Sequence, residues 1–339
     1  MFEDTLRALR QLAETQNTIS FPSDQDGYFD RECPSPECTA QFKVFMADWK
    51  EKVRDEEVFC PFCRHTADAK QWWTQEQAAH INSVVKATIG GAVHEALRSD
   101  SERWNRQQPR GALISMRMHV ESRTQDVPVP LEVASPMRLK ITCSDCGFRY
   151  AVVGAAYFCP ACGHNAADQM FQLTVAGIRQ SLDALDTVRS AITDPDAAEN
   201  TARLIIENGL QNAVSAFQRC AEALFSALPG TGKIRRNAFQ NLVEGSALWT
   251  AAVGTSYEMY LSLTELSRLQ IAFQHRHLLA HTQGVVDADY VAKTGDTRYQ
   301  PGQRVVVRVE AVRDALDLIE KLITGMRRDA SASTGSRTP

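Results

Sequence analysis

The pattern of hydrophobic and polar residues changes at about residue 165. Before this point, short runs of alternating apolar and polar residues predict β-strands, at YFDREC, QFKVFM and EVFC within residues 21–70 and at RLKIT and FRYAVVGAAYF within residues 126–165. After it, apolar residues recur with the period of an α-helix and predict helices at about 166–192, 196–228, 236–252, 256–282 and 309–327. The expected fold class is α+β and multidomain: two small β modules with flanking helices, then an α-helical bundle.

Local signals set the expected ends of the N-terminal elements. Residues 1–20 predict an amphipathic helix. Thr74, with Gln77 three residues later, predicts a capping box at the start of a helix that runs to about Arg98. The rest of the segment 71–125 is expected to hold a polar linker at 99–110 and a strand at 112–122.

The C-terminal region, 166–328, carries similar signals. Asp194 and Pro195 suit the start of its second helix, and Gly284 suits the end of its fourth. A strand or hairpin is expected around 304–309. Residues 329–339 are low in apolar side chains and predict a disordered tail.

Composition narrows the functional class. Of 339 residues, 44% are hydrophobic and 23% charged, which is typical of a globular protein. The net charge of −4 excludes a protein that coats nucleic acid by bulk charge, although a local basic cleft is compatible with it. No apolar run approaches the ~20 residues that span a bilayer, and the N-terminal helix lacks the apolar region of a signal peptide. We therefore expect a soluble, cytoplasmic protein without membrane contact.

Eight of the nine cysteines form two groups with metal-ligand spacing. The first group is C-x4-C-x21-C-x2-C and the second is C-x2-C-x12-C-x2-C, comprising Cys33, Cys38, Cys60 and Cys63, and Cys143, Cys146, Cys159 and Cys162. Zinc takes four such ligands in a tetrahedron, and two knuckles joined by strands are the build of a zinc ribbon. The sequence therefore predicts two zinc ribbons, one in each β module.

Four cysteines leave no open coordination position, so both zinc ions are predicted to be structural, with no catalytic metal. A catalytic zinc is the weaker alternative; His65 and His164 follow knuckles, but neither group needs them. Cys220 stands alone and is predicted to be a small buried apolar residue.

A polar cluster ends the fourth predicted helix. His275, Arg276, His277 and His281 fall within seven positions, and His277 and His281 share a face. Three other interpretations compete with a functional one: exposed cations at a helix C-terminus, a metal site, or core packing. No carboxylate within the helix completes a metal site, and core packing is not expected for four polar groups so close together.

The pattern Arg276-x4-His281 on the penultimate helix resembles the R-x4–6-H motif of HEPN domains (higher eukaryotes and prokaryotes nucleotide-binding). His277 follows the arginine, where many HEPN ribonucleases carry Asn, Asp or His. The stretch from Gly284 to Tyr290 is also similar to bacterial HEPN-like proteins. The resemblance covers about residues 166–328 and implies a helical bundle that forms a homodimer and cleaves RNA without a metal. It also implies a role in defence or toxin systems, where a protein regulator or antitoxin restrains the activity.

The chemistry of RNA cleavage agrees with these residue types. Without a metal, the 2′-hydroxyl must lose a proton, the leaving oxygen must gain one, and the phosphorane charge must be neutralised. Histidine can perform both proton transfers near neutral pH, and the forked charge of arginine suits the third task. Because one His281 cannot easily act on both sides of a phosphate, a two-fold dimer is expected to combine two copies.

Two further polar features have both a functional and a purely structural interpretation. Glu207 ends an otherwise apolar helix stripe, which suggests a semi-buried carboxylate paired with Arg276 or a histidine; the alternative is an exposed residue near a helix start. Lys233, Arg235 and Arg236 form either a phosphate-contacting patch or a solvated loop. The neighbouring PGTGK lacks the residues of a phosphate loop and is interpreted as a helix-ending turn.

The leading hypothesis is an endoribonuclease with Arg276 and His281 as catalytic residues, assisted by His277, with Glu207 as a further candidate and with zinc ribbons that recognise RNA or a partner. The alternative is a non-catalytic zinc-ribbon and helical module that binds protein or nucleic acid. A third hypothesis, a zinc-ribbon regulator of transcription, is disfavoured because no basic recognition helix is evident.

Overall fold

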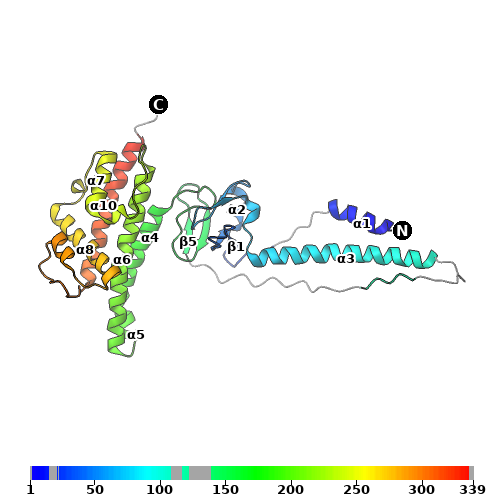
Figure 1. Ribbon diagram of the computed structural model, residues 1–339, viewed down its shortest axis with the longest axis horizontal. Coiled ribbons are helices and arrows are strands. Elements are labelled where there is room, and N and C mark those ends of the chain that lie inside the picture. The colour runs from blue at the N-terminus through cyan, green and yellow to red at the C-terminus, as the bar shows by residue number, and fades with distance from the viewer. Residues whose placement is uncertain (1, 15–20, 22, 108–116, 122–138, 336–339) are drawn as a thin grey trace. The chain divides into compact units, whose positions relative to one another are not determined.

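The computed structural model describes residues 2–14, 21, 23–107, 117–121 and 139–335 (Figure 1). The chain divides into two compact units, residues 1–164 and 165–339. Each unit has its own set of buried apolar side chains. The β-strands lie in the first unit, and the second unit is built from helices.

A four-stranded antiparallel sheet organises the first unit, in the order β1-β2-β6-β5. Its strands are β1 Tyr28–Glu32, β2 Gln41–Phe45, β5 Leu139–Thr142 and β6 Arg149–Val152. The central strands β2 and β6 pair with Lys43 opposite Ala151 and Val44 opposite Tyr150. The two predicted β modules thus share one sheet. The strands β3 Val58–Phe59 and β4 Thr66–Ala67 form a separate pair.

The two cysteine-bearing halves of this unit repeat each other around an approximate two-fold axis. Lys43 and Ala151 face each other across β2 and β6, and each lies five residues after the second cysteine of its hairpin. The two CPxC knuckles also exchange backbone hydrogen bonds. The Phe59 N–H donates to the Pro160 carbonyl at 3.0 Å, and the Phe158 N–H donates to the Pro61 carbonyl at 3.2 Å.

The first unit also contains helices α2 Met46–Lys52 and α3 Gln75–Gln107 and the 3₁₀ turn η1 Ala69–Gln71. The predicted capping box is confirmed at the start of α3, where Thr74 and Gln77 exchange side-chain-to-backbone hydrogen bonds of 3.1 Å each. Helix α1 Glu3–Glu14 packs against the later part of α3. There the Asp100 carboxylate accepts from the first backbone N–H groups of α1 and satisfies donors that a helix leaves unpaired.

The second unit is a helical bundle with short connections. Its elements are α4 Ala167–Asp183, α5 Leu185–Ala191, α6 Pro195–Ala227, η2 Ala238–Gln240, α7 Leu242–Val253, η3 Tyr257–Met259, α8 Leu263–Thr282, α9 Ala288–Thr294 and α10 Val309–Gly335. Asp194 caps α6 by accepting from the Asp196 N–H at 2.9 Å, with Pro195 in the first turn, as predicted. Figure 1 shows α6 running the length of the bundle beside α4 and α10.

The bundle core lies between α4, α6, α8 and α10, whose apolar stripes face one another. It includes Phe171, Phe217, Phe273 and Ile319, each almost fully buried. The rings of Phe217 and Phe273 meet edge to face with centroids 5.5 Å apart, which joins α6 to α8. The Tyr260 ring lies directly against Gly325 of α10, so this position has no room for a side chain.

Several sequence-based expectations differ from the structure. Residues 329–335, predicted to be disordered, extend α10, because Ala330 packs on the core and Asp329 accepts from the Tyr260 hydroxyl at 2.7 Å. Most of the predicted linker 99–110 belongs to α3, where α1 covers it. In place of the strand expected around 304–309, the structure has an isolated bridge between Val285 and Arg304, and α10 begins at Val309. Part of the predicted strand 112–122 lies outside the described residues, and 117–121 form no strand.

The structure also bears on membrane spans and on the PGTGK segment. Among the described residues, each helix is either too short or too polar to cross a bilayer. The PGTGK segment forms a turn after α6, with Gly230 in the left-handed region at φ 79°. The Thr231 hydroxyl donates to the Leu228 carbonyl at 2.9 Å and closes this turn, as predicted.

Candidate functional site

The eight paired cysteines gather into two clusters of four. Within each cluster all sulfur atoms lie within 4.8 Å of one another. The hairpins β1–β2 and β5–β6 each supply two ligands from their turns, and a CPxC knuckle supplies the other two. A left-handed residue follows the second cysteine of every turn or knuckle: Thr39, Arg64, Gly147 and Gly163. This conformation bends the chain so that backbone N–H groups turn back towards sulfur, as for the His65 N–H and Cys63 Sγ at 3.4 Å.

The sulfur geometry of both clusters fits a tetrahedral zinc ion. With Zn–S bonds of about 2.3 Å, the edges of a sulfur tetrahedron measure about 3.8 Å. The Sγ–Sγ distances are 3.8 Å for Cys33–Cys63 and for Cys38–Cys60, 3.8 Å for Cys143–Cys162 and 3.7 Å for Cys146–Cys159. Both groups can therefore hold one metal ion each, in keeping with two zinc ribbons. Since each tetrahedron is filled by protein sulfur, these would be closed, structural sites.

The polar cluster of the bundle lies on the last turns of α8. The rings of His277 and His281 stand next to each other, with centroids 4.7 Å apart and planes inclined by 50°. Both side chains are exposed. Partial burial of the His277 ring, followed by the positive charges of His281 and Lys293, holds the pKa of His277 below its usual value. An imidazole that is uncharged at neutral pH can accept a proton.

Arg276 precedes His277 on α8, is half-buried and is anchored to the bundle. Its Nη1 donates to the Gln240 side-chain oxygen at 2.9 Å. Gln240 in turn donates to Gln218 of α6, which donates to Asn237 at 2.9 Å and to Glu222 at 2.7 Å. The Arg276 Nε is buried and has no hydrogen-bond partner among the described residues. The guanidinium is thus held in place with a donor still to be satisfied.

Arg276 and His281 do not converge within the chain. They stand five residues apart on α8, which at 3.6 residues per turn places their side chains about 140° apart around the helix. His277 and His281 share one face, while Arg276 leans towards η2. One chain therefore presents a histidine pair and a neighbouring guanidinium rather than a closed triad.

His275 differs from the other histidines because it is buried, at 6% exposure. It stacks on Tyr290 with centroids 5.6 Å apart, and its Nε2 lies 2.9 Å from the Tyr290 hydroxyl. Tyr290 also bonds to Asp296 at 2.6 Å. A carboxylate only accepts, so the tyrosine proton goes to Asp296 and the tyrosine oxygen accepts from His275 Nε2–H, which leaves Nδ1 unprotonated. One member of the predicted cluster thus packs in the interior, which was not expected from its polarity.

Glu207 is buried, but its partners differ from those predicted. Its carboxylate binds Arg203, one turn earlier on α6, and Arg304, each at 2.8 Å. Arg304 reaches Glu207 from the segment before α10 and also donates through Nε to the Gln283 carbonyl at 3.0 Å, just after α8. The expected pairing with Arg276 or a histidine is therefore wrong. Glu207 fixes the end of α8 through Arg304.

Several residues around α8 could not be found by sequence reasoning. The ion pair between Asp296 and Arg298, with Arg298 Nε 2.8 Å from Asp296 Oδ1, has no distinctive local motif. Gln218 and Gln240 are separated by a loop, and only the folded bundle shows that they hold Arg276. In the basic loop, Arg235 pairs with Glu244, while Arg235, Arg236 and Asn237 line a cavity of about 440 Å³ beside Gln218.

Comparison of the chain with known protein families, with curated proteins and with solved structures gave no match.

Proposed function

We propose that the helical unit is a metal-independent RNA endonuclease whose active centre forms around the end of α8. The observation that carries the proposal is the adjacent His277–His281 pair on the same helix as an anchored, partly buried Arg276. Two imidazoles and one guanidinium are the groups needed to move two protons and to neutralise a phosphorane. Desolvation strengthens the field of the guanidinium relative to an arginine in water.

The proposed reaction proceeds through the neighbouring hydroxyl of RNA. One imidazole accepts the proton of the 2′-hydroxyl as its oxygen forms a bond to phosphorus. The bond between phosphorus and the 5′-oxygen breaks, and this leaving oxygen takes a proton from an imidazolium. The products are a 2′,3′-cyclic phosphate and a free 5′-hydroxyl. The two His281 side chains of a dimer would perform these two transfers, and the neighbouring His277, whose pKa is held low, would assist them.

A two-fold homodimer would complete the centre. Because Arg276 and His281 of one chain point in different directions, a partner chain is needed to bring a guanidinium opposite a histidine pair. The exposed position of both histidines leaves them available for such a cleft. The zinc unit would then serve to recognise RNA or a regulatory protein, since its closed metal sites leave no position for catalysis.

The proposal is tested by measuring cleavage of single-stranded RNA and of DNA of the same sequence, without magnesium. The wild-type protein, or a triggered form of it, should cleave RNA only. His281→Ala and Arg276→Ala should each lower the rate on the order of 10²–10⁴-fold. His277→Ala should lower it less, and Arg276→Lys should recover little, because an ammonium lacks the guanidinium fork.

Arg189→Ala is the matched control for loss of a guanidinium. Arg189 lies at the surface on α5, and its Nε is 2.9 Å from a carboxylate oxygen of Glu199 on α6. This variant should cleave RNA at the wild-type rate. Unchanged cleavage by His281→Ala, or strict dependence on magnesium, would remove the enzymatic proposal. Retained RNA or protein binding without cleavage would instead support a non-catalytic interaction module.

A further inference from the structure

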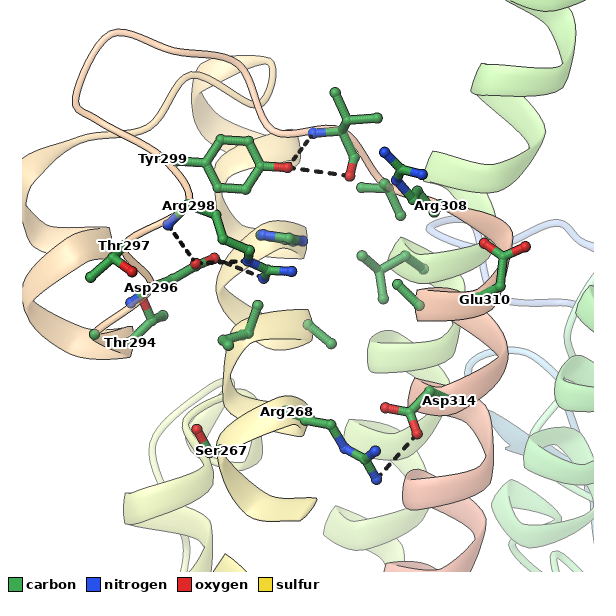
Figure 2. Close-up of a pocket in the computed structure, with 18 residues that line it drawn as sticks. Ser267, Arg268, Thr294, Asp296, Thr297, Arg298, Tyr299, Arg308, Glu310 and Asp314 are labelled. Atoms are coloured by element: carbon green, nitrogen blue, oxygen red, sulfur yellow. Dashed lines mark hydrogen bonds and ion pairs between the residues drawn. The ribbon is translucent and has the colours of Figure 1, made fainter. Parts of the chain in front are cut away.

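Helix α8 presents polar side chains on more than one face. One face borders a cavity of about 570 Å³ between α8, α9 and α10 (Figure 2). Three arginines line this cavity: Arg268, Arg298 and Arg308. Figure 2 shows Arg298 bonded to Asp296 and Arg268 facing Asp314. Two of the three arginines are thus neutralised within the cavity, and the exposed imidazoles of α8 lie outside it.

These imidazoles, His277 and His281, form a pair suited to hold one metal ion. They stand four residues apart, their ring centroids are 4.7 Å apart, and both rings are exposed. With metal–nitrogen bonds of about 2.0–2.1 Å, two nitrogen ligands of one ion lie about 3 Å apart. Rings this close can each turn one nitrogen to that separation. Two histidines at i and i+4 on one face of a helix are also the arrangement by which helical zinc sites chelate their ion.

The end of α8 holds this pair in place. Leu278, between the two histidines, is buried in a small apolar cluster with Tyr290 of α9. Just after the helix, the Gln283 carbonyl accepts from Arg304 Nε at 3.0 Å, and Arg304 is in turn bound to the buried Glu207. Because the helix is fixed on both sides, binding an ion requires only rotation of two exposed side chains, which keeps the entropic cost low.

The charges around the pair also favour a cation. The pair lies in the last turns of α8, where free backbone carbonyls give a helix a partial negative charge. Asp287, at the start of α9, is near enough for its negative charge to act on His277. Lys293 and Arg276 oppose this effect, but Lys293 is paired with Asp289 at 3.2 Å and Arg276 is turned towards η2.

The ligands select the class of ion. Imidazole suits zinc and nickel, whereas magnesium prefers oxygen ligands. Among the described residues, only the two cysteine clusters bring three or more metal ligands within 4.8 Å, so water completes the coordination of an ion at this pair. In catalytic helical zinc sites a glutamate follows the first histidine as the general base. Here the buried Leu278 stands in that position, so the ion has no base beside it.

We propose that His277 and His281 form an exchangeable site for one divalent ion of the zinc–nickel class, and that this ion inhibits the chain. The bound ion takes up the nitrogen lone pairs that must exchange protons, so RNA cleavage stops while it is bound; this consequence rests on the proposed function. Two imidazoles hold an ion less tightly than four thiolates, so dialysis removes it and leaves the two ions of the cysteine clusters in place.

Isothermal titration with zinc chloride tests the site without RNA. The full chain, with both cysteine clusters loaded with zinc and excess metal removed by dialysis, should bind one further zinc ion per chain. Magnesium chloride should give no saturable binding at the same concentrations. Absence of a further saturable zinc ion would overturn the proposal.

Two variants locate the ion. His277→Gln removes one ligand, and the double variant His281→Thr with Thr282→His keeps the composition but places the histidines about 140° apart around the helix. Each should weaken zinc binding at least about tenfold, because a single imidazole remains on that face. The matched control is His94→Gln on α3 of the first unit, which should bind zinc as the wild type does. Wild-type affinity in both site variants would also overturn the proposal.

RNA cleavage tests the inhibition. Zinc at a concentration that saturates the site should stop cleavage by the wild type, whereas His277→Ala, which keeps part of its activity, should need at least about tenfold more zinc. Equal sensitivity of the two proteins would overturn the inhibitory role. A chain that binds the further zinc at this pair but cleaves no RNA would refute the proposed function alone. A chain that cleaves RNA and binds no further zinc would refute the metal site alone.

Discussion

His275 is held uncharged because it is buried on α8 against Tyr290 of α9. Burial, followed by the positive charge of Arg298, lowers its pKa to about 4, while Asp296 opposes the shift. In the unfolded chain an ordinary histidine takes up its proton near pH 6.5. Between these values the unfolded state binds more protons than the folded state. Stability is therefore complete above pH ~6.5 and falls as the pH approaches 4.

As the pH falls from 7 to 4, the lowered pKa of His275 is predicted to reduce the free energy of unfolding of the protein by roughly 3 kcal/mol. Urea unfolding of the wild type and of His275→Gln at several pH values measures it. The variant should begin with lower stability at pH 7 and lose less over the same interval. Parallel pH dependence in the two proteins would show that His275 is not held uncharged.

Glu207 is a positioning residue in this account, since it reaches α8 only through Arg304. Glu207→Gln keeps the shape but removes the charge from two ion pairs whose arginines are about 40% exposed. We expect a loss of about 1–3 kcal/mol in unfolding free energy, measured by denaturant titration. RNA cleavage should fall far less than in His281→Ala. A loss of cleavage equal to that of His281→Ala, in a folded protein, would place Glu207 at the reacting atoms instead.

Among single residues, the sequence identifies those whose partners lie only a few positions away along the chain. The eight cysteines and the His277–His281 pair are of this kind, because knuckle and helix geometry brings them together locally. The partners of Glu207 and of His275 depend on segments 97 and 15 residues away. Polarity alone did not show that His275 would be buried, since its burial requires Tyr290 to supply an acceptor.

Among the elements, the two cysteine hairpins stabilise each other. Their knuckles exchange hydrogen bonds, and their inner strands β2 and β6 pair directly. A metal ion bound in one half would therefore support the conformation of the other. The sequence predicted the strands of each half but not their common sheet, because the pairing joins residues more than 100 positions apart and depends on no local pattern. By contrast, the capped starts of α3 and α6 are local and were predicted.

The metal content of the protein tests whether the two cysteine hairpins stabilise each other. Elemental analysis should find two zinc ions per chain and Cys60→Ser should lower that number by at least one. Because the knuckles are coupled, the remaining zinc should be lost to a chelator faster than in the wild type. Full chelation should unfold residues 1–164 while the helical bundle persists, as followed by limited proteolysis. A zinc content of zero, or independent loss of the two ions, would contradict this arrangement.

On the scale of the whole molecule, the proposed active centre would require the association of two chains. We expect a dimer in sedimentation analysis, and we expect specific RNA cleavage to fall on dilution below the dissociation constant of the dimer. His281→Ala should remain dimeric, which separates assembly from chemistry. A strictly monomeric protein with full activity would refute the composite centre.

The division between a β-rich cysteine region and a helical region could be expected from the change in periodicity near residue 165. The helical structure of residues 329–335 could not be expected from the sequence, because it depends on contacts of Asp329 and Ala330 with the bundle. The cavity beside α10 was equally hidden, since its arginines come from three separate segments of the chain.

The most direct test of the central claim is the chemical identity of the RNA ends. A defined oligonucleotide is cleaved by wild-type protein in magnesium-free buffer, and the fragments are analysed by mass spectrometry. Attack by the neighbouring hydroxyl predicts a 2′,3′-cyclic phosphate on one fragment and a 5′-hydroxyl on the other, and no cleavage where a single 2′-deoxy nucleotide replaces the attacking one. A 5′-phosphate end, or cleavage at the 2′-deoxy position, would contradict the account.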